Sequence, residues 1–398
     1  MGQKPNFSFD DAPREECGVV GALSFTSSDI SRQLYYALIS VQHRGQDTAG
    51  MALFDGEKIN LHRDVGLVSE VFSSTDLGGL NGYVGIAHVR YPTIGAGGPQ
   101  DAQPFMQNSK IGDIALAHNG NIANYGGMRA NLEKEGQKFC STCDAELILT
   151  EFAKKLNGVK GEIFPACAKL MQDLDGAYSV CAVTQRGELI VFRDPNAIRP
   201  FCWGQNDEMI MFASESVALD INNIPLKGDI LPGEVLVITK EGVEKKIVAK
   251  KTSHRHCAFE YVYFSRPDST EEGKLIYEVR MELGRRLART SPVKADIIVP
   301  VPDTSRPAAL GYSEESNIPI SEGLMKNRYI GRTFIMPSQK ERMEAVKLKL
   351  NAVKEIVRGK RIVLIDDSIV RGTTSGPIVK LLKMRAQKRC ICAFPARL

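Results

Sequence analysis

Two adjacent aspartates, Asp366 and Asp367, separate an apolar run from a glycine- and threonine-rich loop. The run RIVLI predicts a buried strand, and the loop at 372–375 (GTTS) leads to Pro377, a residue suited to the first turn of a helix. Free N–H groups at a helix start, together with the helix dipole, favour a bound phosphate. The two carboxylates suit vicinal hydroxyls or a metal ion instead. Together these features describe a site for a ribose phosphate, and the alternative is an acidic strand-to-helix turn that binds nothing.

A second polar segment, VPVPDTSRPAALGY, follows another apolar run and contains Asp303. It would supply a loop at a neighbouring strand end that suits pyrophosphate. Between the two strands lies Lys326–Arg342, which is rich in Lys and Arg and has little apolar periodicity. One interpretation is a solvated loop. We favour a basic lid over a polyanion, because a basic loop beside a phosphate site has a use for its charge.

Cys17 follows a charged, proline-containing lead and opens the strand-like run GVVGALS. One interpretation is a frayed tail before a core cysteine, because free cysteines are among the most buried residues. The other is a leader at 1–16 whose removal makes Cys17 the N-terminal residue. A thiol with a pKa near ~8.5 needs a base to act as a nucleophile. A free α-amino group, with a pKa of ~7.7–8.0, can hold or relay that proton.

Short strands and glycine turns dominate the chain from residue 17 to about 250. Apolar or alternating runs predict strands at GVVGALSF, GYVGIAHVRY, IALAHNG, AYSVCAV, ELIVFRD, MIMFASES and EVLVIT. Two helices are expected, at Ser28–Ser40 and at Asp144–Leu156, the second with an aspartate cap and apolar spacing. Runs of strands with few helices suggest stacked sheets that helices flank.

Beyond about residue 270, predicted strands alternate with predicted helices. A helical stretch at Glu272–Arg289 precedes ADIIVPVPD, and another at Arg342–Val357, with apolar residues on one face, precedes RIVLIDD. Apolar strands that alternate with helices predict a parallel sheet. Ligands of such sheets bind beyond the C-terminal ends of the strands, where both of these strands end in aspartate.

Composition narrows the class of protein. A formal net charge of +4 over 398 residues argues against general nucleic-acid binding. No apolar run reaches the ~18 residues that suggest a membrane span, and the first sixteen residues lack the apolar core of a secretory signal. We therefore expect a cytoplasmic protein. The nine cysteines are odd in number, which disfavours a disulfide framework, and Cys140 and Cys143 lack the second pair of a zinc signature.

Four polar, glycine-rich runs in the N-terminal half have a character that a buried strand would avoid: QHRGQDTAG, HVRYPTIG, HNGNIAN and STCDAE. Together with Cys17, they resemble the N-terminal-nucleophile glutamine amidotransferases. With the ribose-phosphate motif added, the chain from Cys17 to about Lys388 resembles the glutamine phosphoribosylpyrophosphate amidotransferase family.

This resemblance implies the fold class and the domains. We expect an α+β N-terminal-nucleophile glutaminase domain, made of stacked antiparallel sheets with helices, and then an α/β type I phosphoribosyltransferase domain. The leader would occupy 1–16, the glutamine amidotransferase domain 17–250, and the phosphoribosyltransferase domain 251–398, incomplete at its C-terminus.

The resemblance also implies roles in glutamine hydrolysis. Cys17 would be the nucleophile, and the side chain of Asn119 with the N–H of Gly120 would form the oxyanion hole. Arg90 would hold the α-carboxylate of glutamine through a charge-assisted pair, and Asp144 would hold its α-ammonium group.

Three further residues complete the expected glutamine site. Arg44 and Gly45 would shape the pocket around Cys17, and Thr93 belongs to the glutamine-binding set. His88 and His118 would support their loops rather than form a Cys–His dyad, because the terminal amine already fills the role of base.

The expected residues for phosphoribosyl pyrophosphate are Lys326, Asp366, Asp367, Ser368, Arg371, Gly372, Thr373, Thr374 and Ser375. Mg²⁺ would bridge the pyrophosphate and the ribose hydroxyls near Thr304, Asp366 and Asp367. Glutamine, water and phosphoribosyl pyrophosphate would then give phosphoribosylamine, glutamate and pyrophosphate, the first step of purine synthesis. Purine nucleotides are the expected inhibitors, and a homotetramer is the expected assembly.

Some positions depart from the family pattern. Thr304-Ser305-Arg306 stands where the family has Ser-Gly, so a glycine that lets the backbone approach pyrophosphate is missing. Cys257 matches an iron ligand of the branch that carries an iron–sulfur cluster, but the other three family positions lie beyond Leu398. One cysteine cannot hold the cluster, so we expect none on this chain. The shortened chain leaves two alternatives open, a non-catalytic binding protein for phosphoribosyl pyrophosphate or a nucleotide, and a glutaminase alone.

Overall fold

The computed structural model describes residues 17–91, 98–327, 349–369, 375–384 and 389–397. The contacts divide these residues into two compact units, which we call the N-terminal unit (17–260 with 268–274) and the C-terminal unit (261–267 with 275–397). No helix in the described ranges has the length and apolar character needed to cross a membrane.

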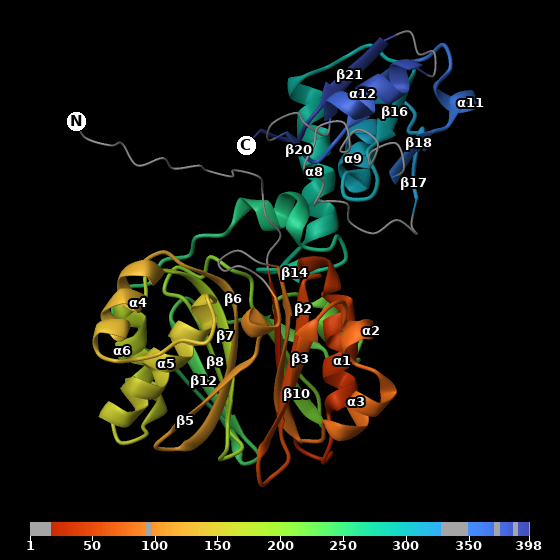
Figure 1. Cartoon of the computed structure of the whole chain (residues 1–398). Coiled ribbons are helices and arrows are strands. Elements are labelled where there is room, and N and C mark those ends of the chain that lie inside the picture. Colours follow the sequence, from red (N-terminus) through yellow and green to blue (C-terminus); the bar gives the residue numbers. More distant parts are fainter. Residues whose placement is uncertain (1–16, 92–97, 328–348, 370–374, 385–388, 398) are drawn as a thin grey trace, which may run out of the picture. The chain divides into compact units, whose positions relative to one another are not determined.

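Two antiparallel sheets form the centre of the N-terminal unit (Figure 1). The first has the strand order β11 (Leu226–Asp229), β9 (Cys202–Gln205), β10 (Met209–Ala213), β1 (Gly18–Ser24), β4 (Val84–Arg90), β2 (Thr48–Phe54), β3 (Ile59–Val65). The second has the order β13 (Gly242–Ile247), β12 (Glu234–Thr239), β8 (Leu189–Arg193), β7 (Gly176–Thr184), β6 (Gly112–Ile122), β5 (Phe105–Ser109).

The core of this unit lies in three layers. Alternate side chains of both sheets, such as Val19 and Leu23 of β1 and Ala115 and Ala117 of β6, fill the space between the sheets. Helices cover the two outer faces (Figure 1). They are α1 (Ser31–Ser40), α2 (Val68–Val71), α3 (Ser74–Gly79) and α7 (Val217–Asp220) beside the first sheet, and α4 (Tyr125–Lys134), α5 (Asp144–Gly158) and α6 (Ile163–Asp173) beside the second.

Short elements complete the connections. They are the 3₁₀ helices at Gln42–Arg44 and Pro99–Asp101, a π-helix at Glu260–Phe264, and the two-stranded sheet of β14 (Thr270–Glu271) and β15 (Lys274–Leu275).

A parallel sheet forms the centre of the C-terminal unit, in the order β16 (Ile297–Pro300), β19 (Arg361–Ile365), β21 (Arg389–Ala393). One face packs on α12 (Ser375–Met384) through Leu364 and Ile378, and the other packs on α8 (Ile276–Thr290) and α9 (Arg306–Ser316). The remaining elements are β17 (Leu324–Lys326), β18 (Leu350–Ala352), α11 (Lys354–Val357), β20 (Ser368–Ile369) and β22 (Ala396–Arg397). The predicted parallel sheet is therefore confirmed.

Two predicted helices need correction. The stretch expected to be helical from Glu272 becomes α8 only at Ile276, because the residues before it form the two-stranded sheet of β14 and β15. The helix expected at Arg342–Val357 is wrong at Leu350–Ala352, whereas Lys354–Val357 does form the short helix α11. Leu350 and Ala352 are the buried positions of strand β18, which pairs with β17, so period-2 burial replaces the helical period that the sequence suggested.

Candidate functional site

Cys17 lies directly before β1, a central strand of the first sheet. Its side chain is buried, with 4% of the residue exposed, and Sγ lies 3.5 Å from the carbonyl oxygen of Tyr91. The carbonyl oxygen of Cys17 accepts a hydrogen bond of 3.0 Å from Nε of Arg44. The thiol therefore sits on a fixed backbone next to the end of β4.

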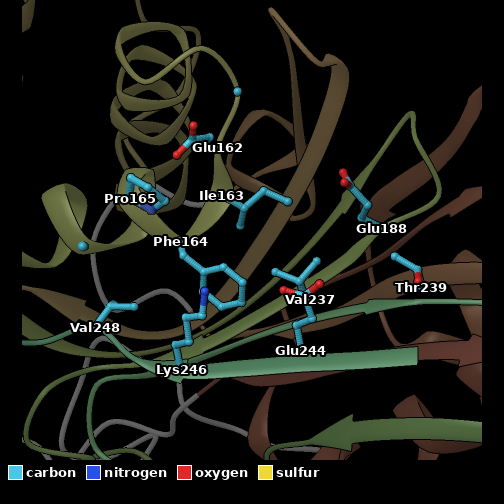
Figure 2. Close-up of a pocket in the computed structure, with 12 residues that line it drawn as sticks. Glu162, Ile163, Phe164, Pro165, Glu188, Val237, Thr239, Glu244, Lys246 and Val248 are labelled. Carbon is cyan, nitrogen blue, oxygen red and sulfur yellow. The ribbon is translucent and has the colours of Figure 1, made fainter. Parts of the chain in front are cut away.

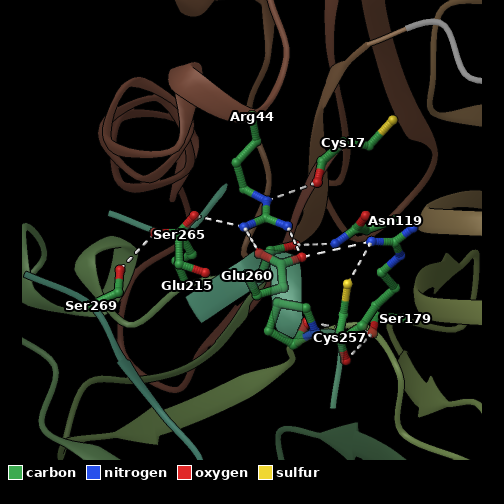
Figure 3. A network of polar contacts seen from close by, with 12 residues as sticks. Cys17, Arg44, Asn119, Ser179, Glu215, Cys257, Glu260, Ser265 and Ser269 are labelled. Carbon is green, nitrogen blue, oxygen red and sulfur yellow. Dashed lines mark hydrogen bonds and ion pairs between the residues drawn. The ribbon is translucent and has the colours of Figure 1, made fainter. Parts of the chain in front are cut away.

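Arg44 is the centre of a buried network of charges (Figure 3). Its Nη1 donates to Oε1 of Glu215 at 2.7 Å, and its Nη2 donates to Oε1 of Glu260 at 2.7 Å. Oε1 of Glu215 also contacts Nε2 of His43 at 2.7 Å, and Oε2 accepts a bond of 2.6 Å from the Ser269 hydroxyl. Burial would raise the pKa of Glu215, but His43 and Arg44 outweigh it and hold that pKa well below its usual value. Nε, Nη1 and Nη2 of Arg44 all donate hydrogen bonds to protein groups. Arg44 therefore positions Cys17 by holding the carbonyl oxygen of that residue.

Gly45 allows two backbone segments to approach each other closely. A Cβ atom at this position would lie 2.6 Å from the backbone nitrogen of Arg90. Any other residue would push the Arg44 segment away from β4.

Arg90 ends β4 and is buried, with 1% of the residue exposed. Its Nη1 lies 3.3 Å from Oδ2 of Asp47, and its Nη2 lies 3.7 Å from Oδ2 of Asp101. These two aspartates, which no sequence pattern pointed to, orient the guanidinium. Thr93, the other residue expected here, lies outside the described residues.

Asn119 and Gly120 lie in β6. The Asn119 amide donates to the Ser214 hydroxyl at 3.3 Å, and the same hydroxyl accepts the N–H of Val19 at 3.0 Å. Ser214 thus joins Asn119 to the strand that follows Cys17. Oδ1 of Asn119 is buried and has no hydrogen-bond partner among the described residues, which is unusual for a buried polar atom without a ligand nearby.

Gly120 faces the neighbouring strand too closely for a side chain. A Cβ atom there would lie 1.9 Å from the carbonyl oxygen of Ala177, and φ is +153°. Glycine is therefore required beside Asn119.

Asp144 begins α5 and is buried. Oδ1 lies 3.0 Å from Nε2 of His118, and Oδ2 accepts the N–H of Ile122 at 3.1 Å. Burial raises the pKa of Asp144, but His118 and the backbone donors outweigh it, so the net pKa is lowered. The carboxylate is consequently charged and ready to accept a cation. The Cys143 thiol lies 3.8 Å from Oδ1, and burial raises its pKa.

The two histidines of this region lie in strands rather than loops. Burial, more than any neighbouring charge, keeps the pKa of His88 well below its usual value, so this ring is neutral. Its Nε2 lies 3.0 Å from the carbonyl oxygen of His118. HVR and HNGNI form the ends of β4 and β6, in agreement with the strands predicted at GYVGIAHVRY and IALAHNG. The expectation that the two histidines support loops is wrong, and contacts such as the His118–Asp144 pair satisfy the buried polar groups at these strand ends.

In the C-terminal unit, the acidic pair follows β19. The N–H of Asp367 donates to Oδ1 of Asp366 at 3.0 Å, and Oδ1 of Asp367 accepts the Ser368 hydroxyl at 2.8 Å. A side-chain hydrogen bond also joins Thr304 to Asp367. Burial, and then the charge of Asp367, raise the pKa of Asp366 to about 7, and burial also raises the pKa of Asp367. The structure thus brings together the three residues expected to lie near a metal ion.

The second strand end carries an ion pair. Nζ of Lys326, at the end of β17, lies 2.9 Å from Oδ2 of Asp303. Ser375, which the sequence placed in the loop, begins α12, so the helix starts two residues before Pro377. Arg371, Gly372, Thr373, Thr374 and residues 328–348, which make up most of the predicted lid, lie outside the described residues.

Cys257 adjoins the Arg44 network through Arg199, whose Nη1 lies 3.9 Å from Oε1 of Glu260 (Figure 3). Sγ of Cys257 lies 4.0 Å from Nη1 of Arg199, and burial raises the pKa of this thiol. A separate groove of about 670 Å³ lies between α6 and strands β12 and β13, where Nζ of Lys246 lies 4.6 Å from the ring centre of Phe164 (Figure 2). None of the predicted site residues lines it.

Comparison with known proteins relates both units to one group. Residues 90–220 match the model of a family described as a glutamine amidotransferase domain. The amidophosphoribosyltransferase of Methanothermobacter thermautotrophicus is 44% identical over 371 residues, which cover 93% of this chain and 78% of the relative. That of Archaeoglobus fulgidus is 45% identical over 367 residues, which cover 92% and 80%.

Comparison with solved structures points to the same family as comparison of the sequences. A glutamine phosphoribosylpyrophosphate amidotransferase from B. subtilis, complexed with ADP and GMP, superimposes with a TM-score of 0.88 at 39% identity. The superposition covers 96% of this chain and 82% of the other. A second structure, described as the allosteric regulatory enzyme of purine biosynthesis, gives the same TM-score and identity over 96% and 81%.

Proposed function

Because the chain belongs to the amidophosphoribosyltransferase family, we propose that its two units divide one reaction between them. The fold class is the expected one, an N-terminal-nucleophile glutaminase fold followed by a phosphoribosyltransferase fold. The activity is the formation of 5-phosphoribosylamine, glutamate and pyrophosphate from glutamine, water and phosphoribosyl pyrophosphate. The N-terminal unit releases ammonia, and the C-terminal unit joins it to the ribose.

In the N-terminal unit, Cys17 attacks the side-chain amide of glutamine. Its own α-amino group, freed by removal of residues 1–16, takes the thiol proton and returns it to the leaving ammonia. Asn119 and the N–H of Gly120 stabilise the oxyanion. Water then releases glutamate from the thioester.

Arg90 and Asp144 select the substrate in this proposal. Arg90 pairs with the α-carboxylate of glutamine, and Asp144 pairs with the α-ammonium group. The lowered pKa of Asp144 supports this assignment, because a charged carboxylate is what an ammonium group needs. Both groups are buried, so water competes little for them.

One observation carries the glutaminase proposal. The Ser214 hydroxyl accepts the N–H of Val19 at 3.0 Å and the amide of Asn119 at 3.3 Å. This bridge ties the strand after the nucleophile to the expected oxyanion donor, although the two segments are about a hundred residues apart in sequence. A cysteine with a purely structural role would not require it.

In the C-terminal unit, Asp366 and Asp367 orient the ribose hydroxyls, and Thr304 lies beside them. Two adjacent, partly buried carboxylates with raised pKa values fit a divalent cation, which would relieve their mutual repulsion. Mg²⁺ held by these residues would neutralise the charge of the pyrophosphate leaving group. Lys326 would exchange Asp303 for a pyrophosphate oxygen, and Ser375 with 371–374 would bind the 5′-phosphate at the start of α12.

The regulation and assembly of the protein are part of the same proposal. Purine nucleotides act as inhibitors, as the ADP and GMP complex of the B. subtilis relative suggests. The chain functions in the cytoplasm as a homo-oligomer. We keep the prediction that these 398 residues bind no iron–sulfur cluster, which iron and sulfide analysis after anaerobic purification will test.

A phosphoribosylamine assay on protein that starts at Cys17 tests the proposed function. We expect synthesis from glutamine or from added ammonia, dependent on Mg²⁺ and phosphoribosyl pyrophosphate. Hydrolysis of glutamine without phosphoribosylamine from either nitrogen source would indicate a glutaminase alone. Binding of phosphoribosyl pyrophosphate without turnover would indicate a binding protein.

A further inference from the structure

Three side chains outside the site described above come together in the N-terminal unit: His254, His256 and Glu272. One possible ligand atom from each lies within 4.8 Å of the others. Among the described residues, this is the single group of three or more His, Cys, Asp or Glu side chains with that geometry. The proposed function gives none of the three a role.

The distances within the group are close to those of a metal site. Nε2 of His254 lies 3.0 Å from Oε1 of Glu272, and the ring centres of His254 and His256 are 4.4 Å apart. Two ligands of one tetrahedral ion, with bonds of ~2.1 Å, are separated by about 3.4 Å. A small rotation of exposed rings therefore suffices to bring all three atoms to one ion.

The backbone around His254 is fixed on both sides. The N–H groups of Ser253 and Arg255 donate to the carbonyl oxygens of Pro195 and Asn196, each at 2.9 Å. The Ser253 hydroxyl also donates to Oδ1 of Asn196 at 2.6 Å. The His-x-His segment is thus held in one position while its rings stay accessible.

Glu272 is fixed equally well. It lies between β14 and β15, where Glu272 and Gly273 both have positive φ, +49° and +72°, as the central residues of a type I′ turn do. The buried Arg193 donates to Oε1 at 2.9 Å and is itself bonded to the carbonyl oxygens of Ala197, Arg199 and Ile230. Oε2 of Glu272 makes no contact of this kind with a described residue, so it is available to an ion.

The geometry points to a binding site for one divalent transition-metal ion, made by His254, His256 and Glu272, with a water molecule as the fourth ligand. Two imidazoles and one carboxylate form a ligand set that suits Zn²⁺ and excludes Mg²⁺, which prefers oxygen ligands. The bound ion joins the segment before Cys257 to the turn between β14 and β15. Its role is structural, and it goes beyond the proposed function.

Zinc titration of the full chain, freed of metal beforehand, tests this site. The triple variant His254→Ala, His256→Ala, Glu272→Gln should lose one equivalent of tightly bound Zn²⁺. Each single variant should weaken that equivalent at least about tenfold, since one of three protein ligands is removed. The two histidines are exposed, so the histidine variants should fold with an unchanged melting temperature without metal. Glu272→Gln keeps a side-chain oxygen that can accept from Arg193, and its own melting curve without metal will show whether it folds.

Two control variants separate this site from other metal ligands. His62→Ala removes a histidine that contacts the carbonyl oxygen of Val71, and Cys257→Ser removes the neighbouring thiol. Both should keep the equivalent that the triple variant loses. Co²⁺ in place of Zn²⁺ should give the d–d absorption of a tetrahedral ion without a thiolate charge-transfer band. Equal Zn²⁺ binding by wild type and triple variant, or loss of the equivalent in Cys257→Ser, would overturn the proposal.

Discussion

Nε2 of His118 lies 3.0 Å from Oδ1 of Asp144 in the buried part of the N-terminal unit. His118 fixes the carboxylate that we propose for the α-ammonium group of glutamine. His118→Ala should raise KM for glutamine roughly 10- to 100-fold, because hydrogen bonds to charged groups contribute about 1.5–3 kcal/mol. Steady-state kinetics with glutamine will measure this.

Ammonia-dependent synthesis by the His118→Ala variant provides the control. It should stay near the wild-type rate, because that reaction bypasses the glutamine site. His118→Gln, which keeps a side-chain N–H donor, should recover part of the glutamine affinity. A His118→Ala variant with normal KM would mean that Asp144 needs no such support.

Gly120→Ala should damage the N-terminal unit. The new Cβ atom would lie 1.9 Å from the carbonyl oxygen of Ala177, so strands β6 and β7 must separate. We expect the free energy of unfolding to fall by about 1–3 kcal/mol or more. Gly126→Ala, in α4, is the matched control, because a Cβ atom there meets nothing within 4 Å. Equal denaturant midpoints for the two variants would refute this account of Gly120.

Asp366 makes the stability of the unliganded protein depend on pH. A carboxyl group whose pKa is raised to about 7 by folding destabilises the fold as pH rises from its unfolded pKa of ~4 to that value. Asp366→Asn removes this penalty. The gain in melting temperature over wild type should therefore be larger at pH 8 than at pH 5.

Asp296→Asn is the control for that comparison. Its hydrogen bonds to Arg361 lower the pKa of Asp296 to about 2, so both its folded and its unfolded values lie below pH 5. The effect of this variant should be the same at pH 5 and pH 8. An Asp366→Asn effect that is equally flat would contradict the raised pKa.

Removal of residues 1–16 should precede activity. While Glu16 is joined to Cys17, the nitrogen of Cys17 is an amide and has no basicity. Intact-mass spectrometry of active protein should therefore give a chain that begins at Cys17. Glutamine-dependent activity in protein that still begins at Met1 would contradict the role of the amine.

The sequence predicted the strands of the N-terminal unit better than it predicted the helices of the C-terminal unit. Runs such as MIMFASES and EVLVIT are apolar over a length typical of strands, and they form β10 and β12. The spacing of Leu350 and Val357 also fits a helix. Leu350 nevertheless lies in a strand, because β18 pairs with β17. Local periodicity cannot distinguish these outcomes in short segments.

The polar contacts of the site were the least predictable part. Ser214 and Asp47 lie far in sequence from Asn119 and Arg90, and no spacing rule links them. His118 was expected to support a loop, and it instead holds Asp144 from within a strand. The glycines were easier, because Gly45 and Gly120 stand inside polar runs where close backbone approach is a common reason for glycine.

The most direct measurement of the central claim compares phosphoribosylamine synthesis from glutamine and from ammonia in the wild-type protein and in the Cys17→Ala variant. Both proteins are prepared as chains that start at residue 17. We predict that glutamine-dependent phosphoribosylamine synthesis is lost, because the nucleophile is gone, while ammonia-dependent synthesis at high pH stays near the wild-type rate. Asp366→Asn combined with Asp367→Asn should abolish both activities and leave Cys17 reactive toward a glutamine-like alkylating agent. Equal loss of both activities in a folded Cys17→Ala variant would contradict the division of the reaction between two sites.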